Sequence, residues 1–287
     1  MPDGSVPYQD GCVAYRDFGG QGPAVMLLHG VGGNLAHWGR VAPLLQQRYR
    51  LIAIDLPSHG ASPAPVVYSF EHDVRAVDEV RRSLALDRPA LVGHSYGGML
   101  AVALGASCPG DYRGVVNIDG VGFALETEGE AKGETQTRRL PVATSVSHGN
   151  EEWLEPEIHR EVKEAAAVGL HLDPDGEMVR RAFQLGEDRR WHSSPSIDRF
   201  VEIVHALEAM PLMPAYAARS CRTVTVIAEL DNAANEAVVA NIRGHVQRVR
   251  AALLAAGLEL DTVSSGHYPH VEVPEVVAVR FRGWIGD

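Results

Sequence analysis

The stretch Val92-Gly93-His94-Ser95-Tyr96-Gly97-Gly98 says more about this 287-residue chain than any other. The apolar run Ala90 to Val92 precedes it, and an apolar helical pattern from Met99 to Leu104 follows it, which predicts a strand, a sharp turn and a helix. A serine at such a turn stands at the carboxyl end of a strand and at the amino end of a helix, where the helix dipole favours negative charge. The Gly-x-Ser-x-Gly pattern in this context predicts that Ser95 is a nucleophile on a strained backbone.

Composition and charge narrow the classes of partner. Hydrophobic residues make up 45% of the chain and charged residues 22%, as in ordinary soluble globular proteins. The net charge of -11 argues against nucleic acid and against an anionic membrane surface, and no apolar run is long enough for a membrane helix. We therefore expect a small-molecule substrate, and the composition does not decide between a monomer and a homo-oligomer.

The cysteines and the first residues of the chain bear on its compartment. Cys12, Cys108 and Cys221 are far apart and odd in number, so a disulfide framework is not expected. Residues 1–10 are polar and contain no apolar signal core. Both observations predict a cytoplasmic protein.

Short apolar runs rich in β-forming residues alternate with longer amphipathic segments along the chain. This alternation predicts an α/β fold with a mostly parallel twisted sheet and helices on both faces. The first predicted strand mixes polar and apolar residues and is expected at an edge of the sheet. The predicted strands are residues 12–18, 24–28, 49–54, 90–93, 114–118, 223–228 and 258–264, and the predicted helices are residues 37–47, 70–86, 96–107, 236–256 and 274–284.

The alternation stops between Gly120 and about Pro214. This part contains no strand-like run, has helical patterns at residues 155–168, 177–185 and 197–207, and includes a polar loop at residues 126–139. We expect residues 121–211 to form a helical cap over the carboxyl edge of the sheet, and residues 1–120 and 212–287 to form the core domain. An independent second domain is the alternative, which the weak apolar content disfavours.

A serine hydroxyl needs a base to take its proton, and the base needs an acid to orient it. His267 follows the last predicted strand, so it lies at the same sheet edge as Ser95 and is predicted to be the base. Two residues compete for the role of the acid. Asp231, after strand 223–228, is the first choice because it comes next before the histidine strand, and Asp119, after strand 114–118, is the second.

An oxyanion site needs two backbone N–H donors. Tyr96, the residue after the nucleophile, is predicted to supply one, and Val31 in the glycine-rich turn His29-Gly30-Val31-Gly32-Gly33-Asn34 the other. His29 is expected to hold this turn by hydrogen bonding. The turn lacks the motifs of phosphate-binding and dinucleotide-binding loops, and the 13 histidines form no helical metal motif, so we expect no cofactor and no metal.

Several aromatic residues are candidates for the substrate pocket. His37 and Trp38 follow the glycine-rich turn, where packing at a helix start and a place in the pocket wall are equally good interpretations. Phe123, Trp153 and Trp191 are the large aromatics of the predicted cap, and at least one of them should face the pocket.

Taken together, these motifs resemble the α/β-hydrolase superfamily in its cap-bearing branch. His29-Gly30 is similar to the family's oxyanion motif, Gly93 to Gly97 to its nucleophile elbow, and Gly266 through Pro274 to its histidine loop. Asp55 to Ser62 resembles the family's Asp-x-Pro-Gly-x-Gly-x-Ser loop, with Ser58 where Gly is usual. Ala228 likewise stands where the family usually has Gly, three residues before the acid. The resemblance covers nearly all of the chain outside residues 123–211.

The resemblance and the motifs together imply a serine hydrolase that cleaves a small carboxylic ester, lactone or related acyl substrate. The reaction would use a Ser-His-Asp triad and an acyl-enzyme. The same scaffold also hosts C–C bond hydrolases and cyclases, so a C–C bond hydrolase, a biosynthetic cyclase or a ligand-binding protein is the alternative. The resemblance associates dehalogenases and epoxide hydrolases with Asp at the position of Ser95, which argues against both.

Overall fold

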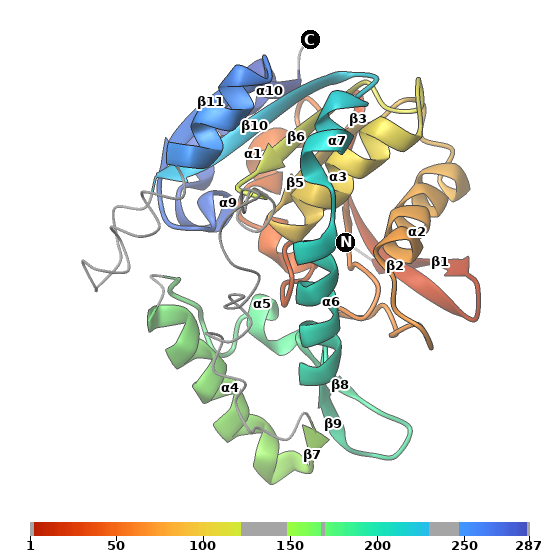
Figure 1. Ribbon diagram of the computed structural model, residues 1–287. Helices are drawn as coiled ribbons and strands as arrows, with labels where there is room; N and C mark the ends of the chain where they lie inside the picture. Colours follow the sequence, from red (N-terminus) through yellow and green to blue (C-terminus); the bar gives the residue numbers. More distant parts are fainter. Residues whose placement is uncertain (1–2, 122–147, 168–169, 230–246, 286–287) are drawn as a thin grey trace.

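The structure is a computed structural model that describes residues 3–121, 148–167, 170–229 and 247–285 (Figure 1). Eight strands form one sheet in the order β1-β2-β4-β3-β5-β6-β10-β11. The strands from β4 to β11 pair in parallel, whereas β1 and β2 are antiparallel. The predicted mostly parallel sheet is confirmed. The strands are β1 Asp3–Tyr8, β2 Gly11–Gly19, β3 Ala24–Leu28, β4 Arg50–Ile54, β5 Ala90–His94, β6 Gly114–Ile118, β10 Arg222–Glu229 and β11 Glu259–Ser264.

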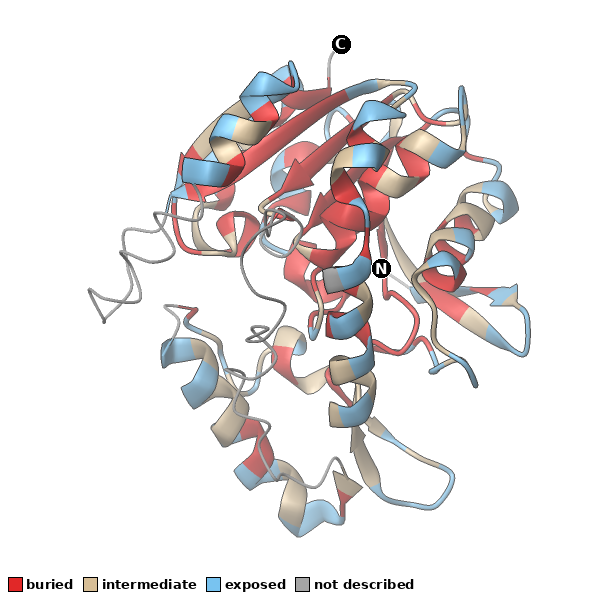
Figure 2. Cartoon of the chain, in the orientation of Figure 1, coloured by how far each residue is buried: buried red, intermediate tan, exposed pale blue. Residues whose placement is uncertain are grey.

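The central strands are apolar on both sides because helices cover both faces of the sheet. Alternate residues of β3 show this division. Met26 and Leu28 belong to one core cluster, together with α2 (Phe70–Ser83) and α3 (Tyr96–Ser107). Val25 and Leu27 belong to the other, together with α1 (Ala42–Leu45) and α10 (Pro274–Ile285). Figure 2 shows the buried sheet in red between helices whose outer faces are pale blue.

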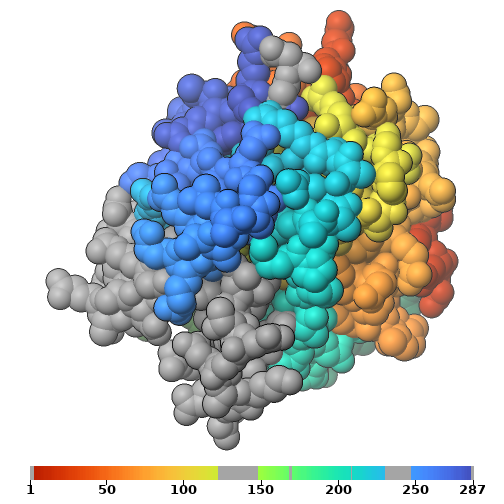
Figure 3. All heavy atoms as spheres, turned by 45° about the horizontal axis from the view of Figure 1, so that its top comes forward, coloured from red at the N-terminus to blue at the C-terminus, as the bar shows by residue number. Residues whose placement is uncertain are grey.

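The face of the sheet that carries α2 and α3 is completed by two further helical segments. α7 (Leu212–Ala217) and the helical residues 247–255 contribute Leu212, Tyr216, Val249 and Leu253 to the same core cluster. Figure 3 shows the outer surface there, from blue C-terminal residues through cyan residues near α7 to yellow and orange residues of α3 and α2. Among the described helices, none is long and apolar enough to cross a bilayer.

Two local expectations were wrong, and a third lies partly outside the described residues. β1 was missed, and it, rather than β2, forms the edge next to β2. The predicted helix 37–47 is two short pieces, the 3₁₀ helix η1 (Leu35–Trp38) and α1, because Gly39 ends the first and Pro43 begins the second. Of the predicted helix 236–256, only residues 247–256 lie in the described part, and 247–255 are helical.

The chain between β6 and β10 contains more than helices. Its helices α4 (Glu151–Ala167), α5 (Glu177–Arg180) and α6 (Ile197–Ala209) accompany a small sheet of three short strands. The expectation of no strands here was wrong, because strands of two or three residues are too short to show alternation. Figure 1 shows α4, α5 and these strands grouped on one side of the main sheet. The strands are β7 His148–Gly149, β8 Phe183–Leu185 and β9 Trp191–Ser193.

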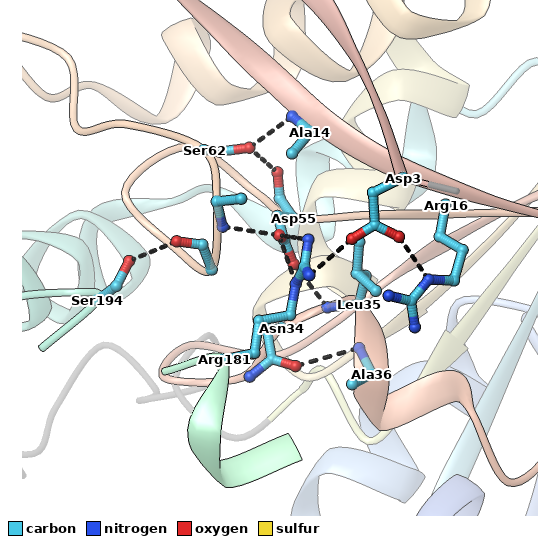
Figure 4. Close-up of polar contacts among 12 residues, drawn as sticks. Asp3, Ala14, Arg16, Asn34, Leu35, Ala36, Asp55, Ser62, Arg181 and Ser194 are labelled. Atoms are coloured by element: carbon cyan, nitrogen blue, oxygen red, sulfur yellow. Dashed lines mark hydrogen bonds and ion pairs between the residues drawn. The ribbon is translucent and has the colours of Figure 1, made fainter. Parts of the chain in front are cut away.

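One buried carboxylate joins this inserted segment to the core (Figure 4). Asp55 follows β4, is fully buried, and accepts hydrogen bonds of 2.8 Å from the N–H groups of Leu35 and Ala61. Arg181, just after α5, donates from Nε to Asp55 Oδ2 at 2.9 Å and from Nη1 to Asp3 Oδ2 at 2.7 Å. The carboxylate of Asp55 therefore holds η1, its own loop and the inserted segment together.

The same loop contains the departure from the family pattern at Ser58. Its φ of 72° is the left-handed conformation that normally favours glycine, and its hydroxyl is buried without a partner among the described residues. Ser194 of the inserted segment donates to the carbonyl oxygens of Ser58 and Gly60, at 3.0 and 3.2 Å. Ser194 thus holds the backbone of this loop, in which Ser58 has the conformation that a glycine usually takes.

His29, His37, His94 and His270 are among the histidines buried near the carboxyl edge of the sheet. Burial lowers the pKa of each, that of His37 to about 4 and those of the other three well below the usual value. His270 has no hydrogen-bond partner for either ring nitrogen among the described residues and packs 4.4 Å from Trp38, between ring centroids. All four stay neutral in the folded protein near pH 7.

Replacing Arg181 by Met should destabilise the protein by about 3 kcal/mol, since Asp55 would be left buried without its countercharge. Chemical denaturation would measure the loss. Arg180→Met is the matched control, because Arg180 lies one residue away but pairs with exposed carboxylates of Glu155 and Asp175. Equal stability of the two variants would contradict the anchoring role of Arg181.

Stability should decline on acidification because of the buried histidines. Below about pH 6.5 the unfolded chain protonates these side chains while the folded protein does not, so the unfolded state binds more protons and the free energy of unfolding falls with pH. His270→Leu removes one of these titrating groups. It should therefore reduce the change of the free energy of unfolding with pH by up to about 1.4 kcal/mol per pH unit, which is the contribution of one proton. Thermal melts between pH 7 and 5 would test this, with the exposed His171→Leu as control; identical slopes would refute it.

Candidate active site

The backbone strain that the Gly-x-Ser-x-Gly motif predicts is present at Ser95. The residue joins β5 to α3 with φ 49° and ψ -115°. A Cβ on Gly93 would lie 2.0 Å from the carbonyl oxygen of Gly97, so only glycine fits there. The N–H of Ser95 donates to Ile118 O at 2.8 Å, and that of Gly97 to His29 O at 3.1 Å. These bonds fix the turn against the ends of β6 and β3.

His267 lies in the loop between β11 and α9 (Pro269–Glu272), at the same edge of the sheet as Ser95. Its ring centroid is 4.6 Å from that of His94, the residue before Ser95, and its side chain is 41% exposed. Ser95 is half-buried, and its Oγ has no hydrogen-bond partner among the described residues. In catalytic pairs of serine and histidine, the hydrogen bond between the two side chains often forms only when substrate binds.

Asp119 is the carboxylate beside His267. Its Oδ2 lies 2.6 Å from His267 Nδ1, and its Oδ1 accepts from the N–H of Ala228 at 3.1 Å. Asp119 has φ 53° and follows β6, which pairs directly with β5, so the strand order places it near the turn of Ser95. Asp231, the first choice from the sequence, lies outside the described residues. The contact reverses the order of preference and favours Asp119.

The glycine-rich turn after β3 is held by two neutral histidines. His29 donates from Nδ1 to Gly30 O at 2.7 Å and accepts from the N–H of Leu56 at 3.0 Å. His59 Nε2 accepts from the N–H of Gly32 at 3.1 Å. Burial lowers the pKa of both histidines, which keeps an acceptor nitrogen on each ring. The holding role expected for His29 is thus accompanied by a similar role for His59, which the sequence did not single out for this turn.

The two predicted oxyanion donors remain available in this arrangement. Among the described residues, the N–H groups of Val31 and Tyr96 have no acceptor. The turn lies against Ser95, because a Cβ on Gly30 would be 3.1 Å from Ser95 Cβ. The Tyr96 side chain points into the core, where its hydroxyl donates to the buried Asp73. This anchor fixes the first turn of α3.

The predicted pocket residues have different surroundings. Trp38 is fully buried in the core cluster of α1 and α10, which favours packing over a place in a pocket wall, and His37 is buried beside Tyr268. Trp191 of β9 and Trp153 of α4 pack in the inserted segment against Ile158 and Phe183. Phe123 lies outside the described residues.

Sequence reasoning missed Phe200 of α6. Its ring lies 3.7 Å from the position that a Cβ on Gly32 would take, so α6 reaches the glycine-rich turn. Ile203 and Leu207 of the same helix belong to the core cluster that Val31 packs against. The spacing of Phe200, Ile203, Val204 and Leu207 was the available signal, since it marks one face of a helix.

Within the described residues, one group has metal-ligand types close together: Asp78, Cys108 and Asp111. Both carboxylates already pair with Arg81, and Asp78 also accepts from Tyr112. Cys108 follows the far end of α3 from Ser95. This group therefore lies away from the candidate catalytic residues and has protein partners of its own.

Comparison with known proteins extends the resemblance. A family model described as "Alpha/beta hydrolase family" matches residues 25–280. A fluoroacetate dehalogenase of Burkholderia sp is 44% identical over 86 residues, which is 28% of this chain and 28% of that protein. A pimeloyl-[acyl-carrier protein] methyl ester esterase of Methylococcus capsulatus is 41% identical over 92 residues, 32% of this chain and 34% of that protein. The alignments thus span about a third or less of these relatives.

Solved structures resemble the chain over its whole length. The E-2-(acetamidomethylene)succinate hydrolase superposes with a TM-score of 0.73 at 23% identity, covering 99% of this chain and 98% of the other. The enol-lactonase from Burkholderia xenovorans LB400 superposes with a TM-score of 0.69 at 18% identity, covering 99% and 100%. At these identities the likeness is one of fold. The family model, matched over most of the sequence, identifies this chain as a member of the alpha/beta hydrolase family.

Proposed function

We propose that this chain is a serine hydrolase that cleaves a small carboxylic ester, a lactone or a related acyl substrate. The observation that carries the proposal is the pairing of His267 Nδ1 with Asp119 Oδ2, at 2.6 Å, beside a serine held in strained geometry at the start of α3. Such a chain of acid, histidine and serine serves nucleophilic acyl transfer. No cofactor is needed for this chemistry.

In the proposed reaction Ser95 Oγ attacks the carbonyl carbon while its proton passes to His267 Nε2. Asp119 accepts the hydrogen bond from Nδ1–H and stabilises the imidazolium. The N–H groups of Val31 and Tyr96 stabilise the oxyanion of the tetrahedral intermediate. The intermediate collapses as His267 returns the proton to the leaving oxygen, which leaves an acyl-Ser95. Water then attacks the acyl carbon while His267 takes one of its protons, and His267 passes that proton to Ser95 Oγ as the acid is released.

The inserted segment is proposed to cap the site, with residues 121–211 as the cap and residues 1–120 and 212–287 as the core. Two contacts support this division. Phe200 reaches the turn that holds Val31, and Arg181 reaches Asp55. A cap in this position would shape the pocket and limit the size of the substrate. We further propose a cytoplasmic location, without nucleic-acid or membrane partners, on the charge and cysteine content of the chain.

The names of the relatives support hydrolysis and differ in substrate. One curated relative is named as a methyl ester esterase, and one structural neighbour as an enol-lactonase. Another relative is named as a dehalogenase, but Ser95 stands where the family resemblance associates that reaction with Asp. C–C bond hydrolysis on the same triad is the second candidate, because a carbonyl next to the cleaved bond would meet the same nucleophile.

Ser95→Ala should lower turnover by roughly 10⁴-fold or more and leave the fold intact, because no other group forms the acyl-enzyme. His267→Ala should lose a similar factor. The double variant should lose little more than either single variant, since the two residues act as one unit. Turnover would be measured on a substrate found by screening a panel of esters, lactones and thioesters. Covalent labelling by a fluorophosphonate probe would show whether Ser95 is an activated nucleophile. Near-normal turnover by Ser95→Ala, or losses that multiply, would contradict the mechanism.

Asp119→Asn should lower turnover by roughly 10³- to 10⁴-fold, because an amide at this place favours the wrong imidazole tautomer. Asp231→Asn is the matched control, and it should retain most of the activity. Steady-state kinetics of both variants on one substrate would decide between the two acids. A crippled Asp231→Asn together with an active Asp119→Asn would overturn the assignment and leave the hydrolase proposal standing.

A further inference from the structure

The loop that carries His267, residues 265–268, is held by hydrogen bonds to its backbone from two side chains. Glu272 Oε2 accepts from the N–H of Gly266 at 2.7 Å, and its Oε1 accepts from the N–H of Tyr268 at 3.0 Å. His94 Nε2 lies 2.6 Å from the carbonyl oxygen of His267. Three successive residues centred on the proposed base are therefore each bound through the main chain.

Glu272 can bind both N–H groups because the chain turns back on itself at α9. The N–H groups of Val271 and Glu272 both donate to Tyr268 O at 2.9 Å, which returns the carboxylate to the loop. A Cβ on Gly266 would lie 2.7 Å from Glu272 Oε1, so residue 266 must lack a side chain for the carboxylate to approach. A charged acceptor makes stronger hydrogen bonds than a neutral one.

His94 acts from the opposite side, inside the core. It is buried, and burial keeps its pKa well below the usual value, so the ring is neutral. Because the partner of Nε2 is a carbonyl oxygen, Nε2 carries the proton and donates it. The other nitrogen, Nδ1, would lie 2.9 Å from a Cβ on Gly30. His94 therefore touches the oxyanion turn, neighbours Ser95 in the chain and binds the loop of His267.

The His267 ring packs near the rings of His94 and Tyr268, at 4.6 and 5.1 Å between centroids, and has few polar contacts of its own. Among the described residues its hydrogen bond to Asp119 is the one its ring makes, and the side chain is 41% exposed. Its position thus depends on the backbone that carries it. A displacement of about 1 Å in a catalytic group can cost roughly 100-fold in rate.

We propose that Glu272 and His94 are positioning residues, which together clamp the backbone of residues 266–268 so that the His267 ring meets both Asp119 and Ser95. This proposal rests on the proposed hydrolase function. Neither residue touches substrate. Their loss acts on proton transfer through His267, so turnover falls while KM changes little.

The test compares variants with and without the hydrogen-bonding atoms. Glu272→Met removes both acceptors, and Glu272→Gln keeps one. For the other side, His94→Met removes the donor, and His94→Gln keeps an N–H at a similar reach. We expect the Met variants to slow fluorophosphonate labelling of Ser95 by roughly 10- to 100-fold, with KM for an ester within about twofold of the wild type, and the Gln variants to recover part of the loss. Glu275→Met is the control, since Glu275 is exposed and three residues away.

A second readout does not need activity. Proton NMR of the unlabelled protein should show the Nδ1 proton of His267 far downfield, because it lies in a short hydrogen bond to a carboxylate. The Met variants should shift or broaden this signal, and Glu275→Met should not. Met variants that label at the wild-type rate and keep this signal would overturn the clamp. If the wild type shows the signal, and the variants perturb it, but Ser95 does not label, the clamp stands and the hydrolase proposal fails. Should Met at either position prevent folding, the Gln variants carry the same comparison.

Discussion

Two backbone hydrogen bonds at the turn between β5 and α3 hold the catalytic edge together. Ser95 N–H donates to the end of β6, and Gly97 N–H donates to the end of β3. The strands on either side of β5 are thereby joined to the turn that carries the half-buried Ser95. The strained φ of Ser95 persists because these bonds and the close approach of Gly93 to Gly97 leave the turn no other conformation. The glycine-rich turn His29 to Asn34 directly follows β3, and Asp119 directly follows β6.

Sequence patterns predicted the strands well, and they could not give the order of the strands in space. Every predicted strand is present, because runs of apolar β-forming residues are a local signal. The choice between two candidates for the carboxylate beside His267 could not be made from such local patterns. Asp119 follows β6 and Asp231 follows β10, and β6 lies two strands from β11, so chain order alone could not show that Asp119 meets His267. Pairing between strands depends on the whole chain, so no window of sequence contains it.

The inserted segment was the least readable part for a similar reason. Its short strands carry no period, and its contacts with the core depend on single residues such as Arg181 and Phe200. The partner of Arg181 lies more than a hundred residues away in the chain, in the loop of Asp55. The sequence around an arginine in a polar segment does not indicate that the arginine pairs with a buried carboxylate elsewhere in the chain. Trp38 was also hard to place from the sequence, because its burial depends on residues of α1 and α10 that pack in the same core cluster.

Tyr216 of α7 gives the inserted segment a particular freedom. Its hydroxyl accepts from Asn117 of β6 at 2.8 Å and lies 2.7 Å from Thr225 of β10. Side chains of β6, α7 and β10 thus bond these three elements directly to one another. Evolution could exchange that segment for one of another length or shape without reordering the sheet. Substrate range and catalytic chemistry can then change separately within one fold.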